Sequence, residues 1–343
     1  MGKIPAMKLG QWAKMLIIGL LTWPAPAWAV AESVTESFVA TATTIQASGN
    51  SAPRVSYFAL QMITPARYAG TVTAFAPGRM SDANAVWIQN QFNGSNGLFY
   101  VEFDSGAMAD ITSTDASTKT LSFAGNLPSP IAAGNAYRIR RHFTLADLFG
   151  ANNDAGLLPG QNAAQADNVL LHMPQTQQTH TIFYSSVPGF TGWYFDNYVP
   201  AGATAIYPEQ GVMVRRKGPQ NLTLYLNGPT KEGTTMAPIF SGFNLVGTLK
   251  SKKALKLSEL NLYTGNPSTG MAGASNPSSG DNLIMIRPDS TTTTFFYSNF
   301  PGFEGWYDSS FSASGNVVIQ AGTSFFVHRK SPNGLFFWNI LTE

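Results

Sequence analysis

The sequence contains no cysteine, which excludes disulfide bonds, thiolate nucleophiles, zinc–thiolate sites and a lipidated N-terminal cysteine. Charged residues make up 12% of the 343 residues, about half of the usual share, so few carboxylates are at hand for acid–base chemistry. The sequence also lacks a Gly-x-Ser-x-Gly elbow, a His-Glu-x-x-His helix and a phosphate-binding glycine loop. We therefore expect a protein that is not an enzyme and that uses neither a cofactor nor a metal.

Long hydrophobic runs are also missing. The apolar run Met15–Trp23 is about half of the roughly 20 residues that a membrane-spanning helix needs. It follows three lysines and precedes Ala27-Trp28-Ala29, which has small residues at the two positions that a signal peptidase recognises. We predict a signal peptide at residues 1–29, cleaved near Ala29. The product should be secreted to the periplasm, the cell surface or the exterior, without a transmembrane segment.

Removal of this leader changes the charge of the protein. The full chain has 21 basic and 19 acidic residues, and loss of the three leader lysines leaves 18 against 19, a net charge of −1. The basic isoelectric point is thus largely a property of the leader, and we expect no nucleic-acid partner. The sequence does not identify the partner; polysaccharide and other envelope proteins are the candidates.

The mature part contains an internal duplication. The segment Tyr184–Tyr194 (YSSVPGFTGWY) returns as Tyr297–Tyr307 (YSNFPGFEGWY), with eight of eleven positions identical at a constant shift of 113. A short helix is expected near the start of each copy, at Phe143–Leu148 and at Leu255–Leu260, the first with a Thr144-x-x-Asp147 capping box. Strand-like runs separated by Gly, Pro and Asn clusters follow in both copies.

These patterns predict a mainly β fold with two duplicated β-rich units, each a β-sandwich with one short helix, and a small β domain inserted in the first. The insert shows a period of two at Phe99–Asp104 and further short apolar runs, among them Val86–Ile88. The predicted boundaries are a signal peptide at 1–29, an N-terminal segment at 30–54, β repeat 1 at 55–64 and 142–238, the insert at 65–141, and β repeat 2 at 239–343.

Several segments together resemble a known family. They are Leu98–Gly106 (LFYVEFDSG), Phe143–Phe149 (FTLADLF), Gly211–Val214 (GVMV) and Gly322–Val327 (GTSFFV), downstream of the leader. The chain resembles a family of secreted proteins of Verrucomicrobia that occurs as several paralogues per genome and has no established activity. The resemblance covers nearly all of the mature chain and rests on strand and turn signatures. It implies a secreted β protein and carries over no catalytic or binding residue.

The duplicated Gly-Trp-Tyr segments supply the candidate ligand-binding residues Trp193, Tyr194, Trp306 and Tyr307. As an aromatic platform, they would stack on sugar rings. As core residues, the two tryptophans would bury a large apolar area in each repeat, and we favour this second interpretation. No catalytic or metal-binding residue is predicted.

Other polar residues have structural interpretations. His172 and His180 could face each other across a hairpin as half of a metal site, but copy two has no histidine at either position. The carboxylates shared by the copies are Asp147 with Glu259 and Asp167 with Asp281, which we expect to cap a helix and a turn. The basic clusters at 138–141, 215–217 and 250–253 are expected to be solvated strand edges and turns, with an anionic polysaccharide as the alternative.

The sequence therefore favours a secreted, non-enzymatic β protein that serves as a structural or surface-interaction module of the cell envelope or exterior. The alternatives are a carbohydrate-binding protein that uses the Gly-Trp-Tyr loops and a glycan-active enzyme built from two distant carboxylates.

Overall fold

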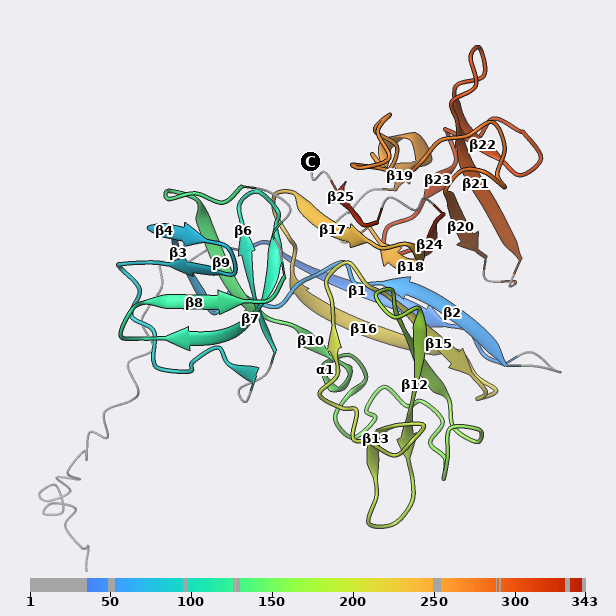
Figure 1. The fold of residues 1–343 in the computed structure, drawn as a ribbon. Coiled ribbons are helices and arrows are strands. Elements are labelled where there is room, and N and C mark those ends of the chain that lie inside the picture. The colour runs from blue at the N-terminus through green and yellow to red at the C-terminus, as the bar shows by residue number, and fades with distance from the viewer. Residues whose placement is uncertain are drawn as a thin grey trace, which may run out of the picture. The chain divides into compact units, whose positions relative to one another are not determined.

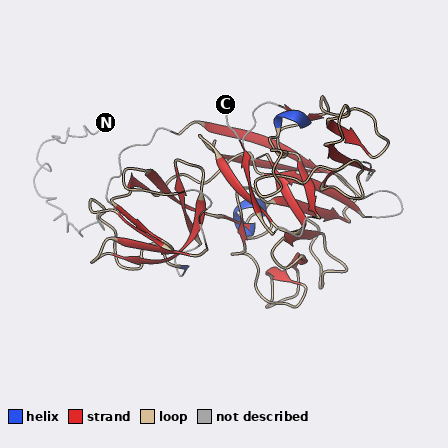
Figure 2. Ribbon diagram, turned by 45° about the horizontal axis from the view of Figure 1, so that its top comes forward, coloured by secondary structure: helices blue, strands red, loops and turns tan. Residues whose placement is uncertain are grey.

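The computed structural model is mainly β, with antiparallel strands throughout and only short helical segments (Figures 1 and 2). It describes residues 36–48, 53–94, 98–125, 127, 130–248, 254–287, 289, 291–330 and 334–340. The predicted signal peptide and the basic cluster at 250–253 lie outside these ranges. Within them, no helix is long and apolar enough to cross a membrane.

The first repeat is a sandwich of one five-stranded sheet and one two-stranded ribbon around a shared core. The sheet has the order β13-β12-β11-β15-β2, the ribbon joins β1 to β16, and a short pair joins β10 to β14. The elements are β1 (Phe38–Ile45), β2 (Arg54–Ala59), β10 (Phe143–Thr144), α1 (Leu145–Phe149), β11 (Asn168–Met173), β12 (Gln178–Ser185), β13 (Gly192–Phe195), β14 (Ala205–Ile206), β15 (Gly211–Arg216) and β16 (Leu222–Pro229).

The second repeat has the same arrangement, strand for strand. Its sheet runs β22-β21-β20-β24-β18, its ribbon joins β17 to β25, and its short pair joins β19 to β23. The elements are β17 (Thr235–Ile239), β18 (Gly242–Gly247), β19 (Leu255–Lys256), the 3₁₀ turn η2 (Leu257–Glu259), β20 (Asn282–Ile286), β21 (Thr292–Ser298), β22 (Gly305–Asp308), β23 (Val318–Ile319), β24 (Ser324–Arg329) and β25 (Phe336–Ile340).

Two of the predicted boundaries need correction. Residues 30–54 were expected to precede repeat 1, but β1 pairs with β16 along its whole length, from Phe38 opposite Pro229 to Ile45 opposite Leu222. Residues 235–238 were assigned to repeat 1, but β17 pairs with β25 of repeat 2, with Thr235 opposite Ile340. Each sandwich therefore begins with a ribbon strand that the sequence comparison had not assigned to it.

The two predicted helices differ in length. In α1, the Thr144 hydroxyl accepts a hydrogen bond from the Asp147 amide while the Asp147 carboxylate accepts one from the Thr144 amide, which is the predicted capping box. In the second copy Lys256 stands at the cap and offers no side-chain acceptor, although its amide donates to Glu259. With half of the box missing, only a 3₁₀ turn forms there.

The strands of residues 68–141 form a sheet of their own with the order β3-β9-β6-β7-β8-β5-β4. The two edge strands, β3 and β4, are separated in the chain by only Val72 and Thr73. The Val72 amide donates to the Asn135 carbonyl on one side, and the Thr73 amide donates to the Ser81 carbonyl on the other. This bent segment therefore closes the sheet into a barrel. Val86–Ile88, predicted as a strand, is irregular: Trp87 is buried and its two neighbours are exposed. The strands are β3 (Tyr68–Thr71), β4 (Ala74–Ala76), β5 (Arg79–Ser81), β6 (Phe99–Phe103), β7 (Met108–Asp115), β8 (Thr120–Phe123) and β9 (Ala136–Arg141).

Strand β6 alternates in sequence, but all five of its residues are buried. Its polar face lies against a buried ion-pair network in which Glu102 contacts both Arg140, at 2.8 Å, and Lys231. Arg140 also pairs with Glu36. The basic cluster at 138–141 is therefore not simply a solvated edge, since Arg140 is 3% exposed and compensated by carboxylates from distant segments.

The two repeats pack sheet against sheet through the faces turned away from their own cores. Leu170 and Met213 of the first sheet meet Leu245 and Phe326 of the second. The amide of Ala59 also donates to the Gly322 carbonyl at 2.8 Å across this contact. Both faces of each sheet are thus partly covered, which explains the long apolar runs of their strands.

Candidate functional site

The candidate residues lie on a hairpin that occurs once in each repeat, β12–β13 and β21–β22. At its tip the amide of Phe190 donates to the carbonyl of Val187, and the amide of Phe303 donates to that of Phe300, both at 2.9 Å. Pro occupies the second turn position and Gly the third, where Gly189 and Gly302 have φ of 80° and 83°. This is the geometry of a type II turn, which requires a positive φ at the third position, so the Pro-Gly pair is explained by the backbone alone.

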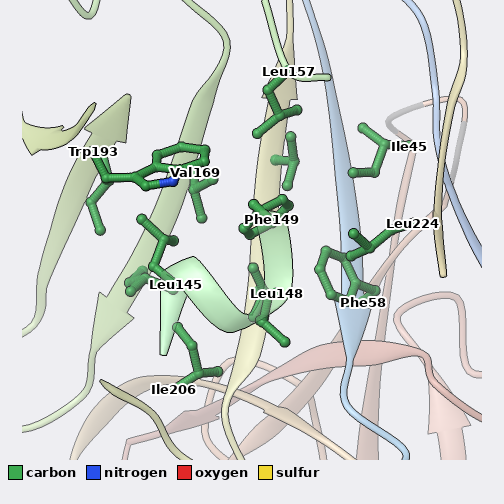
Figure 3. Packing of buried hydrophobic residues seen from close by; sticks show 14 of the residues in the cluster. Ile45, Phe58, Leu145, Leu148, Phe149, Leu157, Val169, Trp193, Ile206 and Leu224 are labelled. Atoms are coloured by element: carbon green, nitrogen blue, oxygen red, sulfur yellow. The ribbon is translucent and has the colours of Figure 1, made fainter. Parts of the chain in front are cut away.

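Trp193 is a core residue of repeat 1. Its side chain is 4% exposed, its indole N–H donates to the Gly150 carbonyl at 2.8 Å, and its ring meets Tyr184 edge-on at 5.2 Å. Figure 3 shows the indole beside Val169, in the same core as Phe149 of α1. The ring lies between the sheet and the helix and offers no open face to a ligand.

Trp306 occupies the equivalent place in repeat 2. It is 6% exposed and packs edge-on against Tyr297 at 5.7 Å. Tyr194 and Tyr307, the neighbours of the two tryptophans on the other face of the strand, are half-buried. Of the four candidate residues, the structure therefore places the tryptophans in the two cores and leaves only the tyrosine rings partly accessible.

The exposed aromatic residues of the hairpins are different ones. Phe190 is 60% exposed and Phe303, at the same turn position of the other copy, is 62% exposed. In the second copy Phe300 lies 6.1 Å from Phe303 and is itself 52% exposed. Our prediction did not include these phenylalanines, although Phe190 and Phe303 belong to the repeated Pro-Gly-Phe and the turn itself needs no apolar residue at that position.

One further exposed aromatic residue follows each hairpin, Tyr198 in repeat 1 and Phe311 in repeat 2. Tyr198 and Phe311 have φ of 64° and 61°, the left-handed region that bulky side chains rarely enter. Each ring packs edge-on at 5.6 Å against a fully buried phenylalanine of its own sheet, Phe183 or Phe296. In both repeats this strained backbone conformation places an aromatic ring over the face of the sheet that is turned away from the core. About half of each of these two residues stays exposed.

The histidines predicted as a possible half metal site do not face each other. The register places His172 opposite Thr179 and His180 opposite Leu171, so the two imidazoles lie on opposite faces of the sheet. His172 instead contacts the Phe243 carbonyl of repeat 2 at 2.8 Å. Among the described residues, no group of three or more His, Asp or Glu side chains could hold a metal ion.

The carboxylates shared by the copies have matching structural contacts. Asp167 accepts hydrogen bonds from the amides of Leu158 and Lys217 and pairs with Arg216. Asp281 accepts in the same way from Ala272 and Lys330. We expected Arg216 to be solvated with its basic neighbours. It is instead 6% exposed, because it pairs with Asp167, which also binds the loop before β11 through the Leu158 amide.

No protein-family model, curated protein or solved structure matches the chain. The resemblance to the secreted family of Verrucomicrobia therefore stays a prediction.

Proposed function

We propose that this protein is a secreted, non-enzymatic surface-interaction module that contacts its partner through the tips of the two equivalent hairpins. The observation that supports this most is the retention of an exposed phenylalanine, Phe190 and Phe303, at the same turn position of both copies. Two copies of one contact on one chain raise the apparent affinity for a surface that presents many identical sites.

Folding accounts for most of the duplicated positions of the hairpins. Pro and Gly set the turn, Ser185 and Ser298 accept hydrogen bonds from the turn amides, and Trp193 and Trp306 fill the cores. Phe190 and Phe303 have no comparable role, and a polar residue at the last position of the turn would spare the protein an exposed apolar ring. A retained exposed aromatic residue is the type of side chain that anchors an interface.

We propose polysaccharide of the envelope or exterior as the partner. Aromatic rings at the tips would stack on sugar rings. The hairpins are rich in Ser, Thr and Asn and also carry Asp196, Glu304 and Asp308, and all of these side chains form hydrogen bonds with hydroxyl groups. The assignment of the stacking role thus moves from the two buried tryptophans to the exposed phenylalanines.

The test is co-sedimentation of the mature protein with insoluble chitin, cellulose and peptidoglycan, combined with an assay for released reducing sugar. We expect binding without sugar release, and a loss of at least about tenfold in affinity in the double variant F190S/F303S. The control is V86S/I88S, which removes two equally exposed apolar side chains from the barrel. Binding that survives in F190S/F303S, absence of binding to all three polymers, or sugar release would overturn the proposal.

A further inference from the structure

A separate cleft of about 470 Å³ lies where the barrel, repeat 1 and repeat 2 meet. The barrel contributes Met108 to Asp110 of β7, repeat 1 contributes the loop 207–210 between β14 and β15, and repeat 2 contributes its ribbon through Met236 and Phe337. This volume falls in the range of small-molecule sites, which are commonly found where domains meet.

One wall of the cleft carries a polar network. Asp110 accepts a hydrogen bond from the His142 Nε2 and another from the Tyr207 hydroxyl, both at 2.9 Å. Burial raises the pKa of Asp110, but the hydrogen bonds and charge of His142 and the bond from Tyr207 outweigh it and hold this pKa below its ordinary value. His142 is itself 2% exposed and lies between the rings of Tyr100 and Tyr207. Asp110 is therefore a fixed, ionised carboxylate at neutral pH.

Two polar atoms of this wall are shielded from solvent, and the described residues give neither of them a hydrogen-bond partner. They are Oε2 of Glu209 and Nδ1 of His142. The carboxyl oxygen is fully covered although Glu209 as a whole is only partly buried. Leaving such an atom unpaired costs about 1–3 kcal/mol, so a hydrogen-bond donor that reaches Oε2 of Glu209 would be favoured here.

The cleft is lined by two acids and one histidine, His142, which is already paired with Asp110. Asp110 and Glu209 are the ionisable acids among the described residues that line it, and none of those residues is Lys or Arg. The remaining lining is mainly apolar and includes three methionines, whose flexible side chains adapt to the shape of a ligand. A cation would be attracted by the ionised Asp110, by the carboxyl oxygens of Glu209 and by the faces of the neighbouring aromatic rings.

We propose that this cleft binds a small organic cation, an amine with an apolar body, whose nitrogen donates to Glu209 and lies near Asp110. The apolar body would contact the ribbon of repeat 2 at Met236 and Phe337. This site does not depend on the hairpin tips, so it can be present whether or not the protein binds polysaccharide.

The test compares three ligands that share a phenylalkyl body and have a cationic, a neutral or an anionic head group, namely phenylbutylamine, phenylbutanol and phenylbutanoate. Binding to the full mature protein is measured by calorimetry at neutral pH for the wild type, for E209Q and for E232Q. The last is a matched control, because Glu232 is exposed and does not line the cleft. Because Gln has nearly the same size and shape as Glu, E209Q removes the ionisable group while the cleft keeps its shape.

We expect the amine to bind at least about tenfold more tightly than the alcohol, the carboxylate to bind most weakly, and the preference for the amine to disappear in E209Q alone. The proposal is overturned if the amine and the alcohol bind equally, if E209Q leaves the amine affinity unchanged, if E232Q lowers it as much as E209Q does, or if none of the three ligands binds at about 1 mM. Methyl shifts of Met108 and Met236 on titration provide a second measurement that locates the ligand, and shifts confined to residues outside the cleft would also overturn it.

Discussion

Gly247 of repeat 2 and Ala59 of repeat 1 approach so closely that a Cβ atom added to Gly247 would lie 1.9 Å from the Cβ of Ala59. Gly247 ends β18 and Ala59 ends β2, the equivalent first strands of the two sheets. The amide of Gly247 donates to the Glu209 carbonyl at 3.1 Å, so this close approach also positions the loop that lines the cleft.

We therefore expect G247A to destabilise the protein by more than the usual 1–3 kcal/mol of an overpacked site, since backbone must move to relieve the contact. A59G removes the opposing methyl group and should restore most of the loss when combined with G247A. Urea denaturation of the two single variants and the double variant measures the coupling. Energies that add within about 0.5 kcal/mol would show that the two residues do not meet.

The buried network of Glu102 predicts a stability effect that depends on pH. Burial raises the pKa of Glu102, but Lys231 and Arg140 together lower it below its ordinary value. For an acid with a lowered folded-state pKa, the stabilisation is fully present above the unfolded value of about 4.5 and is lost as the pH falls through the folded value. We expect K231M to cost about 3–5 kcal/mol at neutral pH, because it leaves a buried carboxylate partly uncompensated.

The cost of K231M should shrink as the pH falls below about 4.5, because protonation removes the charge that Lys231 balances. Denaturation curves across this range for wild type and variant give the difference directly. Lys256, whose side chain is exposed, provides the control K256M, for which we expect a change within about 0.5 kcal/mol. A K231M cost that is independent of pH would contradict the assigned pairing.

The duplication was predictable because its turn residues are fixed by backbone geometry and therefore remain recognisable in both copies. The ribbon strands β1 and β17 were not. Phe38–Ile45 consists largely of Ala and Thr, and 235–239 contains Pro238, which argues against a strand except at the edge position that β17 occupies. The buried arginines were also missed, because Glu102 and Asp167 lie 38 and 49 positions from Arg140 and Arg216, so local sequence gives no sign of either pair.

The hairpin was recognisable in the sequence as a repeated segment, but the exposure of its individual residues could not be predicted. Trp193 and Phe190 both belong to one repeated aromatic motif, and only the sheet register decides that the first enters the core while the turn holds the second in solvent. The cleft left no local signature, since Asp110 and Tyr207 are 97 positions apart and are joined by the packing of the barrel on repeat 1.

Glu209 should lower the stability of the folded protein at neutral pH. Burial raises its pKa above the ordinary value, so the folded state holds its proton more tightly than the unfolded state does. With this sign, stability falls as the pH rises from the unfolded to the folded pKa. We expect E209Q to be more stable than wild type by about 1–2 kcal/mol at neutral pH, a gain that fades towards pH 4. A less stable E209Q would show that Oε2 has a partner.

The final prediction separates the two groups of aromatic residues in the hairpins. W193A and W306A should each cost about 3–5 kcal/mol, because each removes a buried ring from a different core and leaves a cavity. W193F keeps most of the volume and loses the hydrogen bond to Gly150, for which we expect about 1–2 kcal/mol. Urea denaturation of the mature protein measures all three variants.

F190S and F303S should change the stability by less than about 0.5 kcal/mol, because their rings are mostly in water and the turn does not need them. Each hairpin would then contain a tryptophan that is needed for folding and a phenylalanine that is not, at the same positions in both copies. A cost above about 1 kcal/mol for either phenylalanine would give its retention a structural cause and remove the main support for a binding role of the tips. A cost below about 1 kcal/mol for either tryptophan would contradict its burial and return the Gly-Trp-Tyr segment to consideration as the sugar platform.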